Sequence, residues 1–130
     1  PELVRAKLAE GGFDTVTLVH NETSTGVLNP LSDIAAVVNE FDDVLLVVDT
    51  VSSFSALPIL TDEIGVDVLL AGVQKAMALP PGLSVFVVSV VVCASFVVGW
   101  LCGCAPCRGH LGQLIFCHRL ADQRLCSVGP

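Results

Sequence analysis

The sequence is short of basic residues. Residues 1–83 carry 12 acidic side chains and only three basic ones, Arg5, Lys7 and Lys75, and the whole 130-residue chain has a formal net charge of −7. Nucleic-acid binding needs clustered basic side chains that neutralise phosphates, so this acidic part argues against a nucleic-acid partner. The chain is 53% hydrophobic and long enough for one domain with a core.

Cysteine is absent from residues 1–83, and all six cysteines lie in residues 84–130. A part without cysteine suits a reducing compartment. The charge balance changes at the same place, because residues 84–130 contain one acidic and three basic residues. The chain begins at Pro1 without a charged and then apolar leader, so we expect no signal peptide, and we expect the true start to be missing.

The order of the expected elements is that of an α/β protein. Apolar and β-branched runs predict strands over four stretches: 13–20, 44–48, 66–71 and 83–88. Helices are expected over 1–10 and after Asn29-Pro30, where the asparagine would cap the helix and the proline would be its first residue. The apolar stripe of this second helix would be Leu31, Ile34, Ala35 and Val38. Residues 51–64 would form a crossover, which implies a mainly parallel sheet with covered faces.

Lys75 is the only lysine after Lys7, and it follows the apolar run Val68–Ala71. Ligand sites in open α/β sheets lie where the parallel strands end, so Lys75 is expected at such a site. Apolar surroundings disfavour the ammonium form, and the neutral amine can form a Schiff base with an aldehyde. The alternative is a solvated lysine in a loop, and spacing alone does not exclude it.

Three polar positions follow three successive strands. Thr23 follows the first strand, Asp49 ends the second, and Gln74 and Lys75 follow the third, so all would meet along one edge of a parallel sheet. Pyridoxal phosphate would explain this set. Its aldehyde suits a lysine, its ring nitrogen suits a carboxylate, and its phosphate and phenolic oxygen need hydroxyl and amide donors. For Asp49 the alternative is an N-cap of the following turn, with Ser52-Ser53 as neighbours.

Three motifs resemble successive motifs of the class V aminotransferases: HNETSTGV at 20–27, VVDTVSS at 47–53 and GVDVLLAGVQKAMALPPGL at 65–83. Within that family they are most similar to the serine–glyoxylate and alanine–glyoxylate aminotransferases. The resemblance covers about residues 1–89 and implies the middle of the large domain of a fold-type I pyridoxal-phosphate enzyme. It also implies a homodimer that transfers an amino group from serine or alanine to glyoxylate or another small 2-oxo acid.

Carried over position by position, the resemblance gives roles to five residues. Lys75 would be the Schiff-base lysine, and Asp49 would be the partner of the pyridinium nitrogen. Val51 would pack on the face of the ring, while Thr23 and Gln74 would bond the phenolic oxygen or the phosphate.

The chain departs from the family in several respects. Val73 stands where family members usually have a small or hydroxyl residue, so we expect a less polar pocket there. The glycine- and serine-rich phosphate loop, the aromatic residue that stacks on the ring and the arginine for the substrate carboxylate are not found in this chain. We therefore expect a transaminase-like chain that is incomplete and inactive alone. Relatives are often peroxisomal or cytosolic, but the terminus Ser127–Pro130 is not a peroxisomal address.

The resemblance ends near Ser89, so residues 90–130 are expected to be a divergent tail from altered splicing or intron read-through. The 19 residues Leu83–Leu101 carry no charge, and a transmembrane helix needs about 20. A second hypothesis is therefore a non-enzymatic fragment that associates with a membrane through residues 83–101, although a valine-rich run also suits a strand. Cys104 and Cys107 form one C-x-x-C without a second properly spaced pair, so we expect no metal site.

Overall fold

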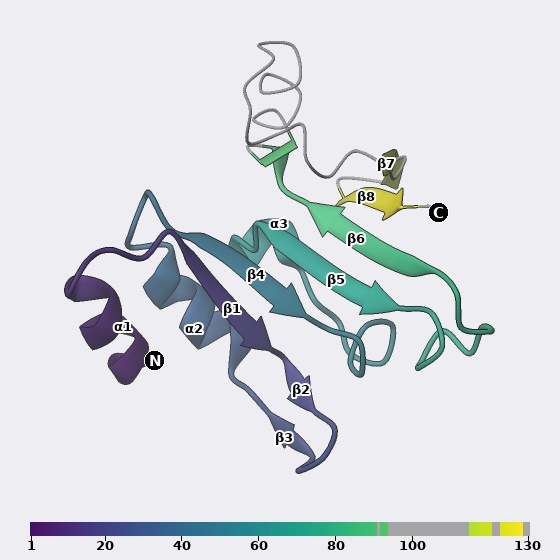
Figure 1. The fold of residues 1–130 in the computed structure, drawn as a ribbon, viewed down its shortest axis with the longest axis horizontal. Coiled ribbons are helices and arrows are strands. Elements are labelled where there is room, and N and C mark those ends of the chain that lie inside the picture. Colours follow the sequence, from purple (N-terminus) through teal and green to yellow (C-terminus); the bar gives the residue numbers. More distant parts are fainter. Residues whose placement is uncertain (91, 94–114, 121–122, 129–130) are drawn as a thin grey trace.

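The computed structural model describes residues 1–90, 92–93, 115–120 and 123–128 (Figure 1). Its elements are α1 (Glu2–Ala9), β1 (Thr15–Val19), β2 (Asn21–Glu22), β3 (Val27–Leu28), α2 (Leu31–Val38), β4 (Leu45–Asp49), α3 (Thr61–Ile64), β5 (Val68–Gly72), β6 (Ser84–Val88), β7 (Ile115–Leu120) and β8 (Gln123–Val128). The four strands expected from the sequence correspond to β1, β4, β5 and β6.

The main sheet has the strand order β1-β4-β5-β6-β8-β7. β1, β4 and β5 are parallel, and they are joined by crossovers that contain α2 and α3. β6 runs antiparallel to β5, and β8 pairs antiparallel with both β6 and β7. β2 and β3 form a separate hairpin after β1. The predicted α/β class with a parallel sheet and crossover helices is confirmed.

One face of the sheet packs against the helices, and α2 passes behind β1 and β4 in Figure 1. Residues alternate along β4, β5 and β6 between buried and less buried positions, because successive side chains of a strand point to opposite faces. The buried positions that meet α2 are Leu46, Val48, Leu69 and Val87. On the other face Val19 and Leu45 remain 40% and 39% exposed. Within the described residues, this face is therefore less covered than the face that packs against α2.

Helix α2 begins at Leu31, with Pro30 in the cap position and no side-chain cap. Asn29 instead donates from Nδ2 to the carbonyl of Val19 at 2.7 Å and from its backbone N–H to the carbonyl of His20 at 2.8 Å. The prediction that Asn29 caps this helix is therefore wrong, because its amide fastens the end of the β2–β3 hairpin to β1. The predicted apolar stripe is confirmed, and all its members are buried: Leu31, Ile34, Ala35 and Val38.

Helix α1 contacts α2 through a buried leucine and an exposed charge pair. Leu8 is 6% exposed and belongs to the core. Arg5 donates to both carboxylate oxygens of Glu40, at 2.9 and 2.6 Å. Exposed ion pairs contribute little, so burial of Leu8 does more to hold α1 in place. Gly11 follows the helix with φ of +77°, the left-handed conformation expected of a glycine at a helix end.

The uncharged stretch 83–101 does not begin as a helix, because Ser84–Val88 form β6. β6 is paired on both sides, by β5 and by β8. Among the described residues no helix is long and apolar enough to cross a membrane. Residues 94–101, Cys104 and Cys107 lie outside the described part of the chain.

Replacing Leu69 with alanine tests the core. Leu69 is a residue of β5 and is 1% exposed, so Leu69→Ala should lower the free energy of unfolding by about 2–5 kcal/mol. Leu83 is 58% exposed, so the matched change Leu83→Ala should stay within about 0.5 kcal/mol. Urea unfolding followed by circular dichroism measures both. Equal losses in the two variants would contradict this core.

Candidate functional site

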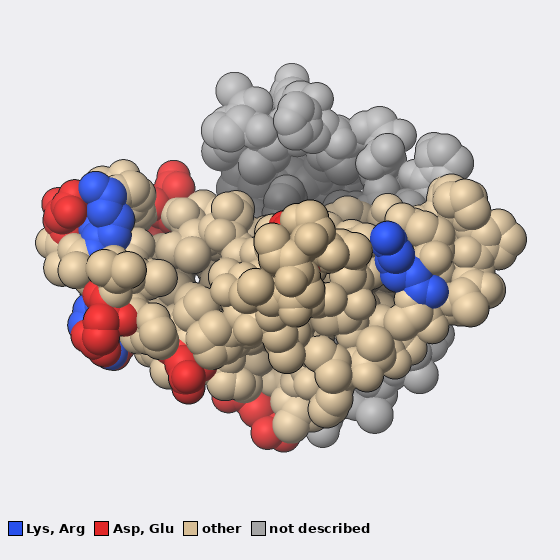
Figure 2. Space-filling view, turned by 90° about the horizontal axis from the view of Figure 1, so that it is seen from below, with Lys and Arg blue, Asp and Glu red and all other residues tan. Residues whose placement is uncertain are grey.

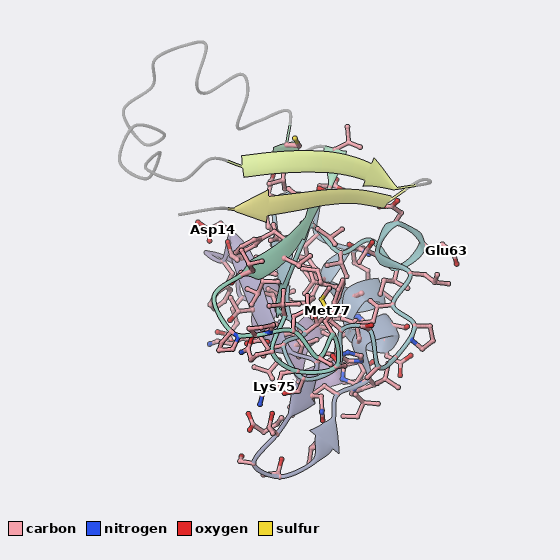
Figure 3. The ribbon with its side chains drawn as sticks, turned by 90° about the vertical axis from the view of Figure 1, so that its right-hand side faces the viewer. Asp14, Glu63, Lys75 and Met77 are labelled. Carbon is pink, nitrogen blue, oxygen red and sulfur yellow. The ribbon has the colours of Figure 1, made fainter. Side chains whose placement is uncertain are left out.

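The carboxyl ends of β1, β4 and β5 lie at one edge of the sheet, at the same end of the molecule as the β2–β3 hairpin (Figure 1). In Figure 3, Lys75 lies at this end and Asp14, which precedes β1, lies at the other. The parallel pairing therefore brings the segments that follow these strands to one edge, as the sequence predicted.

Asp49 is the last residue of β4 and is half-buried. Its Oδ1 accepts a hydrogen bond from the backbone N–H of Val51 at 2.9 Å. This bond is the turn-capping role that the sequence left as an alternative. It uses one carboxylate oxygen, and among the described residues Oδ2 has no hydrogen-bond donor. The carboxylate can therefore cap the turn through Oδ1 and still accept a hydrogen bond from another donor through Oδ2.

Thr23 is connected to the segment that follows β4. Its Oγ1 lies 2.5 Å from Oγ of Ser52, so the two hydroxyls share a hydrogen bond between the β2–β3 hairpin and this segment. The hairpin turn is stiffened by Glu22, whose Oε1 accepts from the backbone N–H and the hydroxyl of Ser24. These two hydrogen bonds, the backbone one first, lower the pKa of Glu22 from its ordinary value. The turn thus presents a fixed hydroxyl next to β4.

Val51 and Gln74 line one cavity of about 440 Å³ on the less covered face of the sheet. This volume is in the range of small-molecule sites. Gly72 leaves room in the cavity for the amide of Gln74. A Cβ at position 72 would lie 2.4 Å from Oε1 of Gln74, which is too close. The remaining lining residues come mainly from β5 and β6 and their connection: Leu70, Ala71, Gly72, Pro81, Gly82, Leu83, Ser84 and Phe86.

Lys75 is exposed and does not line that cavity. Figure 2 shows basic side chains beside acidic ones at one end of the molecule and another basic side chain apart, among uncharged residues. Arg5 and Lys7 form ion pairs with glutamates, and among the described residues Lys75 forms none. The expected apolar surroundings of Lys75 are therefore not formed, because the chain leaves the sheet after Gly72 and carries the lysine into solvent.

Val73 does not belong to the polar part of the site. Its side chain is 2% exposed and packs with Ala71 and Val85, and Phe54 and Met77 cover this cluster. The expectation that Val73 makes the cofactor pocket less polar stays a prediction, and the described contacts place this side chain in an apolar cluster. There it anchors the start of the loop that carries Gln74 and Lys75.

His20 directly follows β1, and its ring has a hydrogen-bond partner. It is 7% exposed, and its Nδ1 lies 2.9 Å from Oγ of Ser53, which is 1% exposed. Burial lowers the pKa of His20 below its ordinary value. Sequence reasoning missed the bonding partners Ser52 and Ser53. Their only signal was a pair of serines shortly after the end of a buried strand.

The sequence matches the family described as aminotransferase class-V over residues 2–99. It is 43% identical over 90 residues to an uncharacterized aminotransferase of Methanocaldococcus jannaschii, covering 68% of this chain and 23% of that protein. It is 42% identical over 98 residues to the serine–glyoxylate aminotransferase of Arabidopsis thaliana, covering 72% of this chain and 23% of that protein.

The fold agrees with these sequence matches. The crystal structure of an alanine–glyoxylate aminotransferase from Nostoc sp. superposes with a TM-score of 0.66 and 38% identity, covering 72% of this chain and 24% of that one. The chain thus spans about a quarter of the length of the relatives that it matches.

The buried state of His20 predicts a pH dependence of stability. Because its pKa is lowered on folding, the unfolded chain binds more protons than the folded chain between the folded pKa and about 6.5. The stabilisation is present above about pH 6.5 and is lost as the pH falls through the folded pKa. We expect the urea concentration at the unfolding midpoint to decrease when the pH is lowered from about 7.5 to about 5.5. This decrease should be smaller in His20→Asn. The other two histidines are common to both proteins, so an identical pH dependence in the variant would refute this prediction.

Proposed function

We propose that the chain is part of a pyridoxal-phosphate-dependent transaminase, since it belongs to the class V aminotransferase family. In this proposal the residues at the carboxyl ends of its parallel strands hold the cofactor. The observation that supports this most is Asp49. It ends a parallel strand with one carboxylate oxygen bonded locally and the other without a donor among the described residues.

The residues at this edge fit pyridoxal phosphate, the cofactor of the family. Asp49 offers an acceptor for the protonated ring nitrogen, and Thr23 offers a hydroxyl for the phenolic oxygen or the phosphate. Gln74 adds an amide in a cavity that Val51 also lines, and Val51 supplies an apolar surface for the ring. Lys75 follows Gln74 directly and supplies the amine. Donors, acceptor, apolar surface and amine are thus all present on neighbouring segments.

These residues have separate tasks in the proposed reaction. When bound, pyridoxal phosphate supplies an electron sink for negative charge that develops at the substrate Cα. Asp49 holds a proton at the ring nitrogen, because a carboxylate beside that nitrogen favours its charged form. Lys75 would hold the cofactor through its amine, and as a free amine it would serve as the base that takes the proton from the substrate Cα. Val51 fixes the plane of the ring by contact.

We propose a small amino acid, serine or alanine, as the amino donor and glyoxylate or another small 2-oxo acid as the acceptor. The support is the similarity to a serine–glyoxylate aminotransferase at 42% identity and to an alanine–glyoxylate aminotransferase at 38% identity. A homodimer is part of the same proposal.

We further propose a boundary near residue 89 between the large-domain part and a divergent tail. The change in charge and cysteine content at this place supports it. The family match continues to residue 99, and β8 pairs with β6 in the same sheet. The proposed boundary therefore separates two parts of different amino-acid composition and does not separate two folded domains.

Lys75 should be the lysine that forms a reducible adduct with pyridoxal phosphate. Borohydride reduction followed by peptide mapping should find the label chiefly at Lys75, because Asp49, Thr23 and Gln74 would hold the cofactor near it. Lys75→Arg should remove most of the label. The matched change Lys7→Arg should leave the label in place, since Lys7 pairs with Glu10 on α1, away from the strand ends. Labelling chiefly at Lys7 or at the amino terminus would refute the assignment.

The 130 residues should not catalyse transamination on their own. The phosphate loop of the family is not found in these residues, so several charge-assisted hydrogen bonds to the cofactor phosphate are missing. Each is worth about 1.5–3 kcal/mol, and their loss lowers the affinity for the cofactor by orders of magnitude. The measurement is glyoxylate-dependent loss of serine or alanine with saturating pyridoxal phosphate. Turnover clearly above that of free cofactor, and abolished by Lys75→Ala, would show that the chain is active by itself.

A further inference from the structure

His20 connects three segments at the edge that carries the candidate site. Its backbone N–H donates to the carbonyl of Asp49 at 2.8 Å, and its own carbonyl accepts from the N–H of Asn29 at 2.8 Å. Its ring reaches Oγ of Ser53 at 2.9 Å. The backbone bond to Asp49 continues the pairing of β1 with β4, whereas the ring contact reaches beyond the end of the strand. His20 therefore holds the residues on both sides of Val51.

The segment 49–57 has few other attachments to the sheet. Thr50 is bonded through its backbone N–H and its hydroxyl to the carbonyl of Leu70, both at 2.9 Å. Beyond Thr50, the hydrogen bonds of the segment are mostly internal turns, such as those from Phe54 to Thr50 and from Leu57 to Ser53. Beyond Thr50, two described side-chain bonds leave the segment, the exposed Thr23–Ser52 contact and the His20–Ser53 contact. Thr50 at 0% exposure anchors the start of the segment, and the His20–Ser53 pair is the buried anchor beyond it.

We propose that His20 and Ser53 are positioning residues, a buried pair that fixes the segment 49–57 and thereby sets the places of Asp49 and Val51. The effect on cofactor binding rests on the proposed function. The fixing of the segment does not, and it can be tested without any cofactor. Buried polar bonds suit this role because a buried hydroxyl that loses its partner is costly, which favours a single arrangement of the segment.

The test compares variants that remove the contact with variants that keep it. Ser53→Ala removes the hydroxyl, and His20→Leu removes the ring nitrogens while filling the site. His20→Asn keeps an amide near the position of Nδ1 and should retain the bond. The matched control is Thr61→Val, because Thr61 is 3% exposed and its hydroxyl has no hydrogen-bond partner among the described residues. All four are made in the full chain.

Hydrogen exchange of the backbone amides is the first measurement. Ser53→Ala and His20→Leu should accelerate exchange in residues 50–57 by about three- to tenfold, the effect expected from losing one hydrogen bond. Exchange in α2 should not change, which separates local fixing from global destabilisation. His20→Asn and Thr61→Val should behave like the unsubstituted chain. Unchanged exchange in residues 50–57, or an equal increase in α2, would overturn the proposal.

Cofactor capture is the second measurement. The concentration of pyridoxal phosphate that gives half-maximal borohydride labelling of Lys75 should rise about three- to tenfold in Ser53→Ala and stay unchanged in Thr61→Val. Faster exchange with unchanged labelling would overturn the positioning of Asp49 and Val51 for the cofactor. If the unsubstituted chain shows no labelling of Lys75, the proposed function fails, and the exchange experiment still decides whether the pair fixes the segment.

Discussion

The parallel pairing of β1, β4 and β5 is the constraint on which the rest of this structure depends. It aligns Val19 with Asp49 and Asp49 with Leu70, so that the three strands end at one edge. β4 and β5 are paired on both sides and β1 on one side, and the polar side chains that follow these strands lie beyond the paired backbone, where they can contact each other or a ligand. Fold and candidate site are consequences of the same register.

Alternation along the strands then separates two functions. The buried positions of β4, β5 and β6 meet α2 and supply the core, and Val73 extends this apolar series beyond the end of β5. The opposite face carries the cavity that Val51 and Gln74 line. Because successive side chains of a strand point to opposite faces, a change on the first face should affect stability, and a change on the second face should affect the cofactor binding proposed above.

The elements could be predicted from the sequence where local patterns decide them. Apolar runs predicted β1, β4, β5 and β6, and the spacing of apolar residues predicted the buried stripe of α2. Predictions from local patterns failed where a side chain could form a hydrogen bond with either of two nearby partners. Asn29 bonds the carbonyl of Val19 and does not cap α2, and this choice depends on where the hairpin returns to β1. The surroundings of Lys75 and Val73 also depend on the path of a loop, which no periodicity records.

Asp49 explains why the edge is suited to a cationic partner. Its Oδ1 accepts a hydrogen bond from the backbone N–H of Val51, and its Oδ2 is not among the buried atoms without a partner, so this oxygen is open to solvent or to a ligand. A protonated ring nitrogen at Oδ2 would complete its hydrogen bonding and neutralise its charge. Since a ligand that binds only the folded chain stabilises it by mass action, the cofactor proposed for this site would also strengthen the sheet edge that holds it. The open Oδ2 of Asp49 thus connects the stability of this fold to its proposed chemistry.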